Sequence, residues 1–402
     1  MLLRRELRTV ARPLASAAWV TAIVLVASSC LSTASPPPKP TPDSVPVASK
    51  PTGPKPTTPR KPQPGVPSTS TPSTTSTVPT SSGPSAPSGP TSSNGQGIQV
   101  DPATLPTGDP GVSTHRIGPA QYSKHTSDGS AQFRTNCRFS HMRYDDPIVA
   151  PGQPGASHLH AFFGNTAINA NTTPGTVATT GNSTCEGGTA NRTAYWAPAV
   201  IDTATNTAVV STDDPHALQV YYKTGYDGVR PETIQNFPTG LRMIAGNARS
   251  TTSQERVSYS CTEGNGPQIA NSASFPNCAP GQILVMSIGF PQCWDGVNLD
   301  SPDHKSHMAY GAGWPDKGCP STHPVPLAQV TQNYRYRVPA TGMATWRLAS
   351  DMYTGPAGYS GHADWMNGWD PTVFQRIIDN CYKGGYDCQM NLLGDGQALT
   401  YN

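Results

Sequence analysis

The chain has 402 residues and a formal net charge of +2, with only 13% charged residues but 43 prolines and 38 glycines. The first 99 residues contribute +7 to the net charge, so residues 100–402 carry −5. This mildly acidic part excludes nucleic acid as the expected partner, because phosphate binding draws on clustered lysine and arginine. The 10 histidines and 9 cysteines are then the side chains that say most about function and location.

The N-terminus predicts export. A cluster of arginines precedes an apolar run over residues 14–27, which is too short for an ordinary membrane span and is typical of a secretory signal. Small residues then lead to Cys30 in a pattern that resembles the bacterial lipobox. We therefore predict a lipoprotein-type signal peptide over 1–29, lipidation of Cys30 and an extracytoplasmic protein whose only membrane contact is this lipid anchor. The alternatives are ordinary cleavage near residues 32–34, which gives a secreted protein, and a permanent signal anchor.

Residues 30–99 predict a disordered linker. They are almost entirely proline, threonine, serine and glycine, with scattered lysine and arginine. Such a composition leaves too little apolar surface to offset the entropy of folding. The prolines favour an extended chain, so roughly 65 residues at up to ~3.1 Å each reach on the order of 200 Å. We expect a passive stalk that carries a domain away from a membrane and into a cell-wall layer.

Residues 110–402 predict one globular domain, because no second linker interrupts them. One helix is expected, with Asp370 as its cap, Pro371 in its first turn and an apolar stripe from Phe374 to Cys381. Short apolar or alternating runs predict strands at 194–201, 218–222, 241–245, 257–261, 283–288, 334–338 and 345–348. The expected fold class is mostly β, a single jelly-roll-like β-sandwich with long loops and one C-terminal helix.

Eight of the nine cysteines lie in this domain, and an even number in an exported domain predicts up to four disulfides. Eight cysteines allow 105 pairings, and the pairs that we expect rest on nearness in the sequence alone. These pairs are Cys137–Cys185, Cys261–Cys278, Cys293–Cys319 and Cys381–Cys388. A zinc–cysteine site is the alternative, which is disfavoured because no Cys-x-x-Cys pair occurs.

The segment Ser157-His158-Leu159-His160 predicts a pair of convergent imidazoles. Alternate residues of an extended strand share a face, so His158 and His160 would point together with Leu159 opposite. This is a common way to place two imidazoles on one metal ion. The segment His362-Ala363-Asp364 repeats the spacing with a carboxylate.

A second histidine segment spans residues 300–307. His304 and His307 lie three positions apart, which places them on one side of a helical turn, and Asp303 or Asp300 would accept an imidazole N–H. His323 follows closely in the sequence. For each histidine taken singly, a hydrogen-bonded structural role is the alternative.

A site of three histidines and a carboxylate suits one divalent ion, namely Zn, Mn, Cu or Ni. The same imidazoles would also serve metal-free acid/base chemistry, as in a lyase. The candidate metal ligands are His158, His160, His304, His307 and His323. The candidate catalytic residues are His158, His160, His304 and His307, with Asp303 as the orienting carboxylate.

Several longer motifs carry a resemblance to a known family. They are Phe133-Arg-Thr-Asn-Cys137, residues 146–152, 157–165, 194–198, Cys293-Trp-Asp-Gly296, 300–310, Cys319-Pro320 and His323-Pro324. In this order they resemble the exported domain-of-unknown-function family nineteen-ninety-six, found in bacteria and fungi, over about residues 133–388. The resemblance implies no established activity. Similar fungal domains often sit beside carbohydrate-binding modules, which implies a glycan setting by association.

We therefore expect an exported, envelope-tethered monomer that acts on or binds cell-wall or extracellular polysaccharide through its histidines. Whether it is an enzyme stays open, and a histidine- or metal-dependent hydrolase or lyase is the candidate class. The alternatives are a non-catalytic carbohydrate-binding or structural surface protein and a metal-binding protein. Serine hydrolases, P-loop proteins and dinucleotide-binding proteins are disfavoured because their motifs are missing from the sequence. A two-carboxylate glycosidase has candidate residues but no spacing that selects a pair: Asp145, Asp146, Asp295, Asp300 and Asp303.

Overall fold

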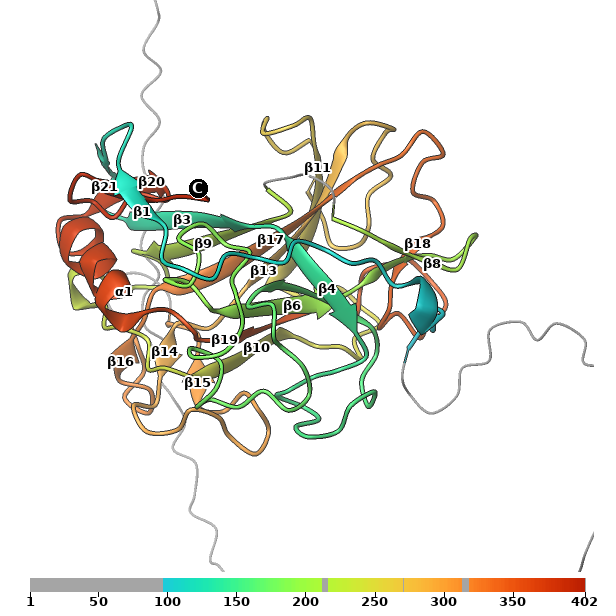
Figure 1. Cartoon of the computed structure of the whole chain (residues 1–402), viewed down its shortest axis with the longest axis horizontal. Coiled ribbons are helices and arrows are strands. Elements are labelled where there is room, and N and C mark those ends of the chain that lie inside the picture. Colours follow the sequence, from blue (N-terminus) through green and yellow to red (C-terminus); the bar gives the residue numbers. More distant parts are fainter. Residues whose placement is uncertain (1–96, 212–215, 270, 313–317, 402) are drawn as a thin grey trace, which may run out of the picture. The chain divides into compact units, whose positions relative to one another are not determined.

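A computed structural model describes residues 97–211, 216–269, 271–312 and 318–401 (Figure 1). The predicted signal peptide, Cys30 and nearly all of the predicted linker lie outside the described residues. Within those ranges no helix has both the length and the apolar character needed to cross a membrane.

Two large sheets form the body of the domain, and Figure 1 shows β9, β17 and β13 in one layer above β6, β19 and β10 in the other. All neighbours are antiparallel except β3 and β20. The larger sheet has the order β12 (Asn271–Ser272), β11 (Val257–Thr262), β13 (Ile283–Gly289), β17 (Gln329–Arg337), β9 (Leu218–Thr224), β3 (Ala131–Cys137), β20 (Tyr386–Met390) and β2 (His125–Thr126). The five-stranded sheet has the order β10 (Arg242–Gly246), β19 (His362–Met366), β6 (Ala194–Pro198), β5 (His160–Gly164) and β4 (Phe139–Arg143).

Three small sheets and a few helical turns complete the structure. The small sheets are β1 (Ile117–Pro119) with β21 (Gln397–Leu399), β15 (Met308–Ala309) with β14 (Cys293–Trp294) and β16 (Val325–Pro326), and β18 (Trp346–Leu348) with β7 (Val200–Asp202) and β8 (Thr207–Val209). Two 3₁₀ turns lie at η1 (Pro102–Thr104) and η2 (Pro231–Thr233).

The main core lies between the two large sheets. Phe163 of β5 packs on Tyr334 of β17 with ring centroids 5.3 Å apart, and the hydroxyls of Tyr195 and Tyr222 hydrogen-bond at 2.7 Å. Alternation explains the arrangement, since every second residue of β9 is buried against this core. The predicted mostly-β, sandwich-like fold is confirmed.

The five-stranded sheet is buried on both faces. A second, smaller apolar cluster covers the face that points away from the main core. It consists of Ile148, Phe162, Ile168, Val177, Ala194, Trp196 and Met366. Strands β5, β6 and β19 are therefore buried along their whole length, and the side chains of alternate residues enter two different environments.

The predicted helix is present as α1 (Pro371–Ile377), and a π-helical segment, η3 (Ile378–Tyr382), continues it. The Asp370 carboxylate accepts hydrogen bonds from the backbone N–H groups of Thr372 and Val373, as a cap does. Phe374 packs on Tyr222 at 5.5 Å between ring centroids, so the helix closes one end of the sandwich.

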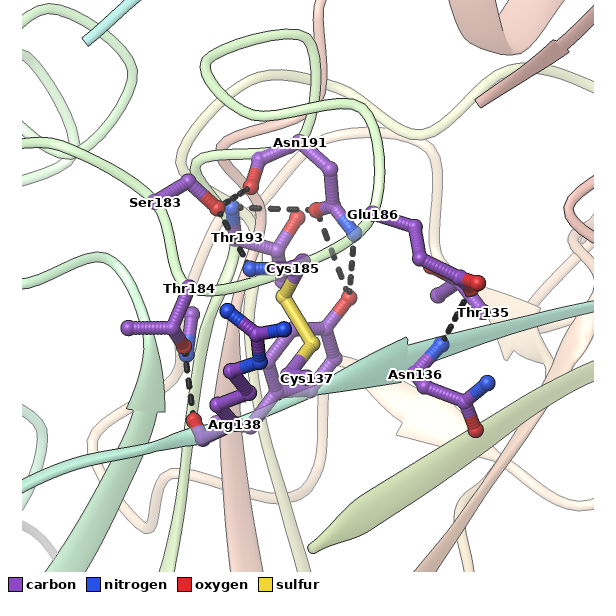
Figure 2. Close-up of a disulfide and its surroundings, with 12 residues drawn as sticks. Thr135, Asn136, Cys137, Arg138, Ser183, Thr184, Cys185, Glu186, Asn191 and Thr193 are labelled. Atoms are coloured by element: carbon purple, nitrogen blue, oxygen red, sulfur yellow. Dashed lines mark hydrogen bonds between the residues drawn. A yellow bond between two sulfur atoms is a disulfide. The ribbon is translucent and has the colours of Figure 1, made fainter. Parts of the chain in front are cut away.

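All four predicted disulfide pairs are formed. Figure 2 shows the first, which joins Cys137 at the end of β3 to Cys185 in the loop before β6. The bond therefore ties a strand of the larger sheet to the loop that leads into the smaller one. Glu186 follows the disulfide, and its carboxylate accepts a hydrogen bond from the backbone N–H of Asn136 at 2.8 Å (Figure 2).

Candidate functional site

Three imidazoles converge on the outward face of the five-stranded sheet. They belong to His158, His160 and His362, and one nitrogen of each lies within 4.8 Å of the others. The Nε2 atoms of His158 and His362 are 3.2 Å apart, and the ring centroids of His158 and His160 are 4.2 Å apart. Two nitrogens bound tetrahedrally to one zinc ion, each ~2.0–2.1 Å from it, lie roughly 3.3 Å apart. The 3.2 Å separation of the His158 and His362 nitrogens therefore matches that of two ligands on one metal ion, and the His160 nitrogen lies within 4.8 Å of both.

The strand order explains how these residues meet. His160 begins β5 and His362 begins β19, and β6 lies between the two strands. Pro198 of β6 pairs with His160. The ring centroids of His160 and His362 lie 5.8 Å apart across β6. Leu159 and Ala363, the residues between the site residues, point to the main core and are fully buried.

Hydrogen bonds orient two of the rings. Nδ1 of His160 lies 3.0 Å from the backbone oxygen of Asp145, and Nδ1 of His362 lies 2.9 Å from that of Ser360. A carbonyl oxygen only accepts, so each Nδ1 carries the proton and each Nε2 presents a lone pair to the cluster. Nε2 of His160 is buried and has no hydrogen-bond partner among the described residues.

Two buried carboxylates, Asp146 and Asp364, complete the site. One oxygen of each lies within 4.8 Å of a ring nitrogen of His160. Asp146 follows β4 and is held by the backbone N–H groups of Ile148 and Val149, both of which donate to its Oδ1. Asp364 lies on β19 on the same face as His362, and its Oδ2 is buried with no partner in the described part of the chain.

Burial dominates the electrostatics of the site. It raises the pKa of the Asp146 carboxyl, and it raises that of Asp364 further with the help of the neighbouring Asp146 charge. Burial also lowers the pKa values of His160 and His362 to about 4 and that of His158 well below its ordinary value. At neutral pH the three imidazoles are therefore uncharged, which is the form that binds metal.

The segment 300–307 lies beside this cluster, and part of it faces the site. Burial raises the pKa values of Asp146 and Asp364, and electrostatic interaction with His304 and Lys305, respectively, opposes a part of this increase. His304 is held by Asp300, with Nδ1 to Oδ2 at 3.0 Å, and Asp300 also pairs with Arg242 at 3.2 Å. His304 and Lys305 line a small cavity of about 130 Å³ that also contacts Gly246, the residue paired with His362. His304 therefore lies near the site but outside the imidazole cluster, and the cavity that it lines contains none of the three clustered imidazoles.

The structure does not bring Asp303, His307 and His323 into the imidazole cluster. Asp303 is exposed and accepts hydrogen bonds from its own loop, at the backbone N–H groups of Lys305 and Ser306. Both nitrogens of His307 are engaged, by the Ser301 hydroxyl at 2.9 Å and the Arg242 carbonyl at 2.6 Å. Nε2 of His323, a partly buried residue near this loop, donates to the Ser306 carbonyl at 2.9 Å. These three residues have structural partners that account for their polar groups.

From the sequence we predicted His158 and His160 as site residues and recognised the same spacing in His362 and Asp364. The sequence did not show that the two segments form one site. The His-x-His and His-x-Asp patterns were the available signal. Joining them requires the strand order, in which β19 and β5 flank β6. Asp146 appeared only among the carboxylates of a possible glycosidase.

The model of one protein family, described as Domain of unknown function (DUF1996), matches residues 146–369. The match begins at Asp146 and includes every residue of the imidazole and carboxylate cluster. No curated protein and no solved structure shows significant similarity to the chain.

Proposed function

Because the chain belongs to the DUF1996 family, whose description names no activity, we propose a function from the site geometry: the domain binds one divalent transition metal ion. The proposed ligands are the Nε2 atoms of His158, His160 and His362. One observation carries the proposal: Nε2 of His160 and Oδ2 of Asp364 are buried at the same site without partners among the described residues.

A purely structural role for the cluster explains the geometry less well. Leaving a buried polar atom unpaired costs about 1–3 kcal/mol, so a folded protein seldom retains two of them side by side. A proton on Nε2 of His158 would satisfy the contact with His362, but it would leave Nε2 of His160 unpaired. A cation bound between the three rings would give Nε2 of His160 a partner, and its positive charge would favour the ionised form of Asp364 beside that ring.

The donor set of imidazole nitrogens and carboxylate oxygens suits Zn, Mn, Cu or Ni, as expected from the sequence. A bound ion of this kind supplies a water of lowered pKa. Asp146 and Asp364 lie next to His160, where a carboxylate would accept a proton from that water. His158 is only partly buried, so the cluster has a side toward solvent.

We propose that the centre acts on extracellular polysaccharide by hydrolysis or elimination. Supporting this setting, the four disulfides fit an extracellular protein, and the predicted proline-rich stalk and lipid on Cys30 would hold the domain in a cell envelope. His160→Ala should abolish turnover of a susceptible glycan while sparing glycan binding. Unchanged turnover in this variant would reject the enzymatic role and leave metal binding alone.

The metal site is tested by elemental analysis of the whole exported chain, purified without a histidine tag because a tag binds metal. We expect about one ion per chain in the wild type and loss of the ion in His160→Ala and His362→Ala. His323→Ala is the matched control, because His323 is a partly buried histidine outside the cluster whose Nε2 already donates to a carbonyl.

The control should keep the ion. A folded wild-type chain that takes up no Zn, Mn, Cu or Ni, or equal metal content in His160→Ala and the wild type, would overturn the proposal. Near-ultraviolet circular dichroism verifies that each variant is folded, so that loss of metal is not confused with loss of structure.

A further inference from the structure

A second candidate site lies on the outer face of the eight-stranded sheet. A cleft of about 440 Å³ runs over β3, β9, β17 and β13 there. This size is within the range of pockets that hold small ligands. Because the inner faces of the two sheets pack on each other, the cleft and the imidazole cluster lie on opposite sides of the sandwich. The cleft is therefore independent of the proposed metal site.

The pleat of the strands makes the cleft polar. In β9, Leu218, Val220 and Tyr222 face the core, so Gln219, Tyr221 and Lys223 face outward. The register aligns further polar residues with them on the neighbouring strands. One row across the sheet is Arg134, Tyr221 and Thr331, and the next contains Gln219 and Asn333.

The cleft carries positive charge. Arg134, Lys223 and Arg335 line it, and none of the described lining residues is acidic. Arg134 is partly balanced by Asp387 at 3.4 Å, although its Nε is buried without a partner in the described structure. Arg335 donates to the Gly264 carbonyl at 2.7 Å.

Lys223 is the least compensated of the three cations. Its Nζ lies 4.5 Å from the centroid of the Tyr221 ring and has neither a hydrogen bond nor an ion pair with any described residue. Burial lowers the pKa of Lys223, and repulsion from Arg134 lowers it further. A negative charge bound beside Lys223 would offset both effects, because it favours the protonated form of the lysine.

The spacing of the cations favours an extended ligand. Lys223 is paired with Gln329, and Arg335 lies six residues farther along β17, so the two cations are roughly 20 Å apart along the strands. Amide and hydroxyl groups of Gln219, Asn333 and Thr331 line the stretch between them. The ligand therefore has widely spaced negative charges separated by hydrogen-bonding groups.

We propose that this cleft binds a segment of an acidic polysaccharide, with sugar carboxylates on Arg134, Lys223 and Arg335 and sugar hydroxyls on the amides between them. Arginine pairs well with carboxylates, and side-chain amides both donate to and accept from hydroxyls. A polysaccharide with a negative charge on every sugar fits the cleft less well, because most of its charges would lie opposite neutral side chains. The cleft thus anchors the domain on a glycan by the side away from the imidazoles.

The test uses hyaluronan, in which a carboxylate-bearing sugar alternates with a neutral one, and the same polymer with its carboxylates reduced to alcohols. Binding to the whole exported chain is measured by calorimetry at low salt and at 0.15 M salt. We expect binding of hyaluronan that weakens with salt, and about tenfold weaker binding by Lys223→Gln. Gln219→Glu, which places a negative charge in the cleft without changing side-chain size, should weaken binding further.

Lys383→Gln is the matched control, since it removes the same charge from an exposed lysine that pairs with Asp379 on the helical segment. It should bind like the wild type, and the metal content of all three variants should be unchanged. Absence of hyaluronan binding by the wild type, equal binding of the reduced polymer, or unaltered binding by both Lys223→Gln and Gln219→Glu would each overturn the proposal. None of these results bears on the metal site.

Discussion

The Nε2 atoms of His158 and His362 lie 3.2 Å apart although 204 positions separate the two residues in the sequence. His158 comes from the loop before β5 and His362 from the start of β19, so the contact depends on the strand order of the five-stranded sheet. The sheet thus brings together two short patterns whose meeting the sequence alone does not show.

Asp145 is expected to support the site without touching the ion. Its two carboxylate oxygens accept the backbone N–H groups of Gly155 and Ala170, and its own carbonyl orients His160. Asp145→Ala leaves the buried Ala170 N–H without its acceptor, so we predict a loss of roughly 1–3 kcal/mol in the free energy of unfolding. Urea denaturation measures the loss. Asp303→Ala removes a fully exposed carboxylate and should have a much smaller effect, and an equal loss in both variants would contradict this role of Asp145.

Glu186 is expected to make stability depend on pH. Burial raises the pKa of its carboxyl from 4.5 to about 7, against the opposing effect of the hydrogen bond from the Asn136 N–H. The folded state therefore holds a proton that the unfolded state has lost, and stability falls as pH rises from about 4.5 to about 7. The total is on the order of 3 kcal/mol.

Glu186→Gln should lack this contribution, so the wild type minus variant difference in unfolding free energy should fall between pH 4.5 and 7 and stay constant above. Denaturation of both proteins at pH 4.5, 6 and 8 measures it. The exposed Glu232, replaced by Gln, is the control and should follow the wild type. Parallel curves for the wild type and Glu186→Gln would show that Glu186 does not titrate in this range.

The disulfides should contribute unequally. Cys137–Cys185 closes a loop with a sequence separation of 48, whereas Cys381–Cys388 closes one of only 7. In the chain-entropy model, replacing both cysteines by alanine costs about 4 kcal/mol for the longer loop and about 2 kcal/mol for the shorter. Chemical denaturation of the two double variants measures the order, and a larger loss for the 381–388 pair would contradict it.

Phe374 should be the residue of the helix that contributes most to stability. It is fully buried against Tyr222, Phe237 and Trp369 at the end of the sandwich. Phe374→Ala should cost about 3–5 kcal/mol because it leaves a cavity in the aromatic cluster. Gln375→Ala, on the same helix but outside this cluster, is the control for helix propensity. Equal melting temperatures of Phe374→Ala and Gln375→Ala would contradict this role of Phe374.

Local signals predicted much of this fold. The helix carried its own cap at Asp370 and a periodic apolar stripe, and strands such as β9 and β13 had clear apolar runs. The disulfide pairs were neighbours along the chain. Strands β5 and β19 were not predicted as strands because both of their faces are buried. Each strand is only five residues long and contains both site residues and core residues. Their patterns suggested only that alternate residues share a face.

The candidate site was predicted in part for the same reason. His158 and His160 are close in sequence, and their side chains converge although His158 lies in the loop before β5 and only His160 belongs to the strand. Their joining with His362, Asp146 and Asp364 follows from tertiary structure. His307 was predicted as a site residue but is not one. Both of its ring nitrogens form hydrogen bonds, to a hydroxyl and to a carbonyl, and the sequence does not identify these partners.

The most direct measurement is crystallography of the metal-loaded protein at the absorption edge of the bound ion. We predict one anomalous peak bonded to Nε2 of His158, His160 and His362, with Asp146 and Asp364 beside it. A protein that shows no peak at these imidazoles, or whose ion lies instead on His307 or His323, would overturn the proposed metal site.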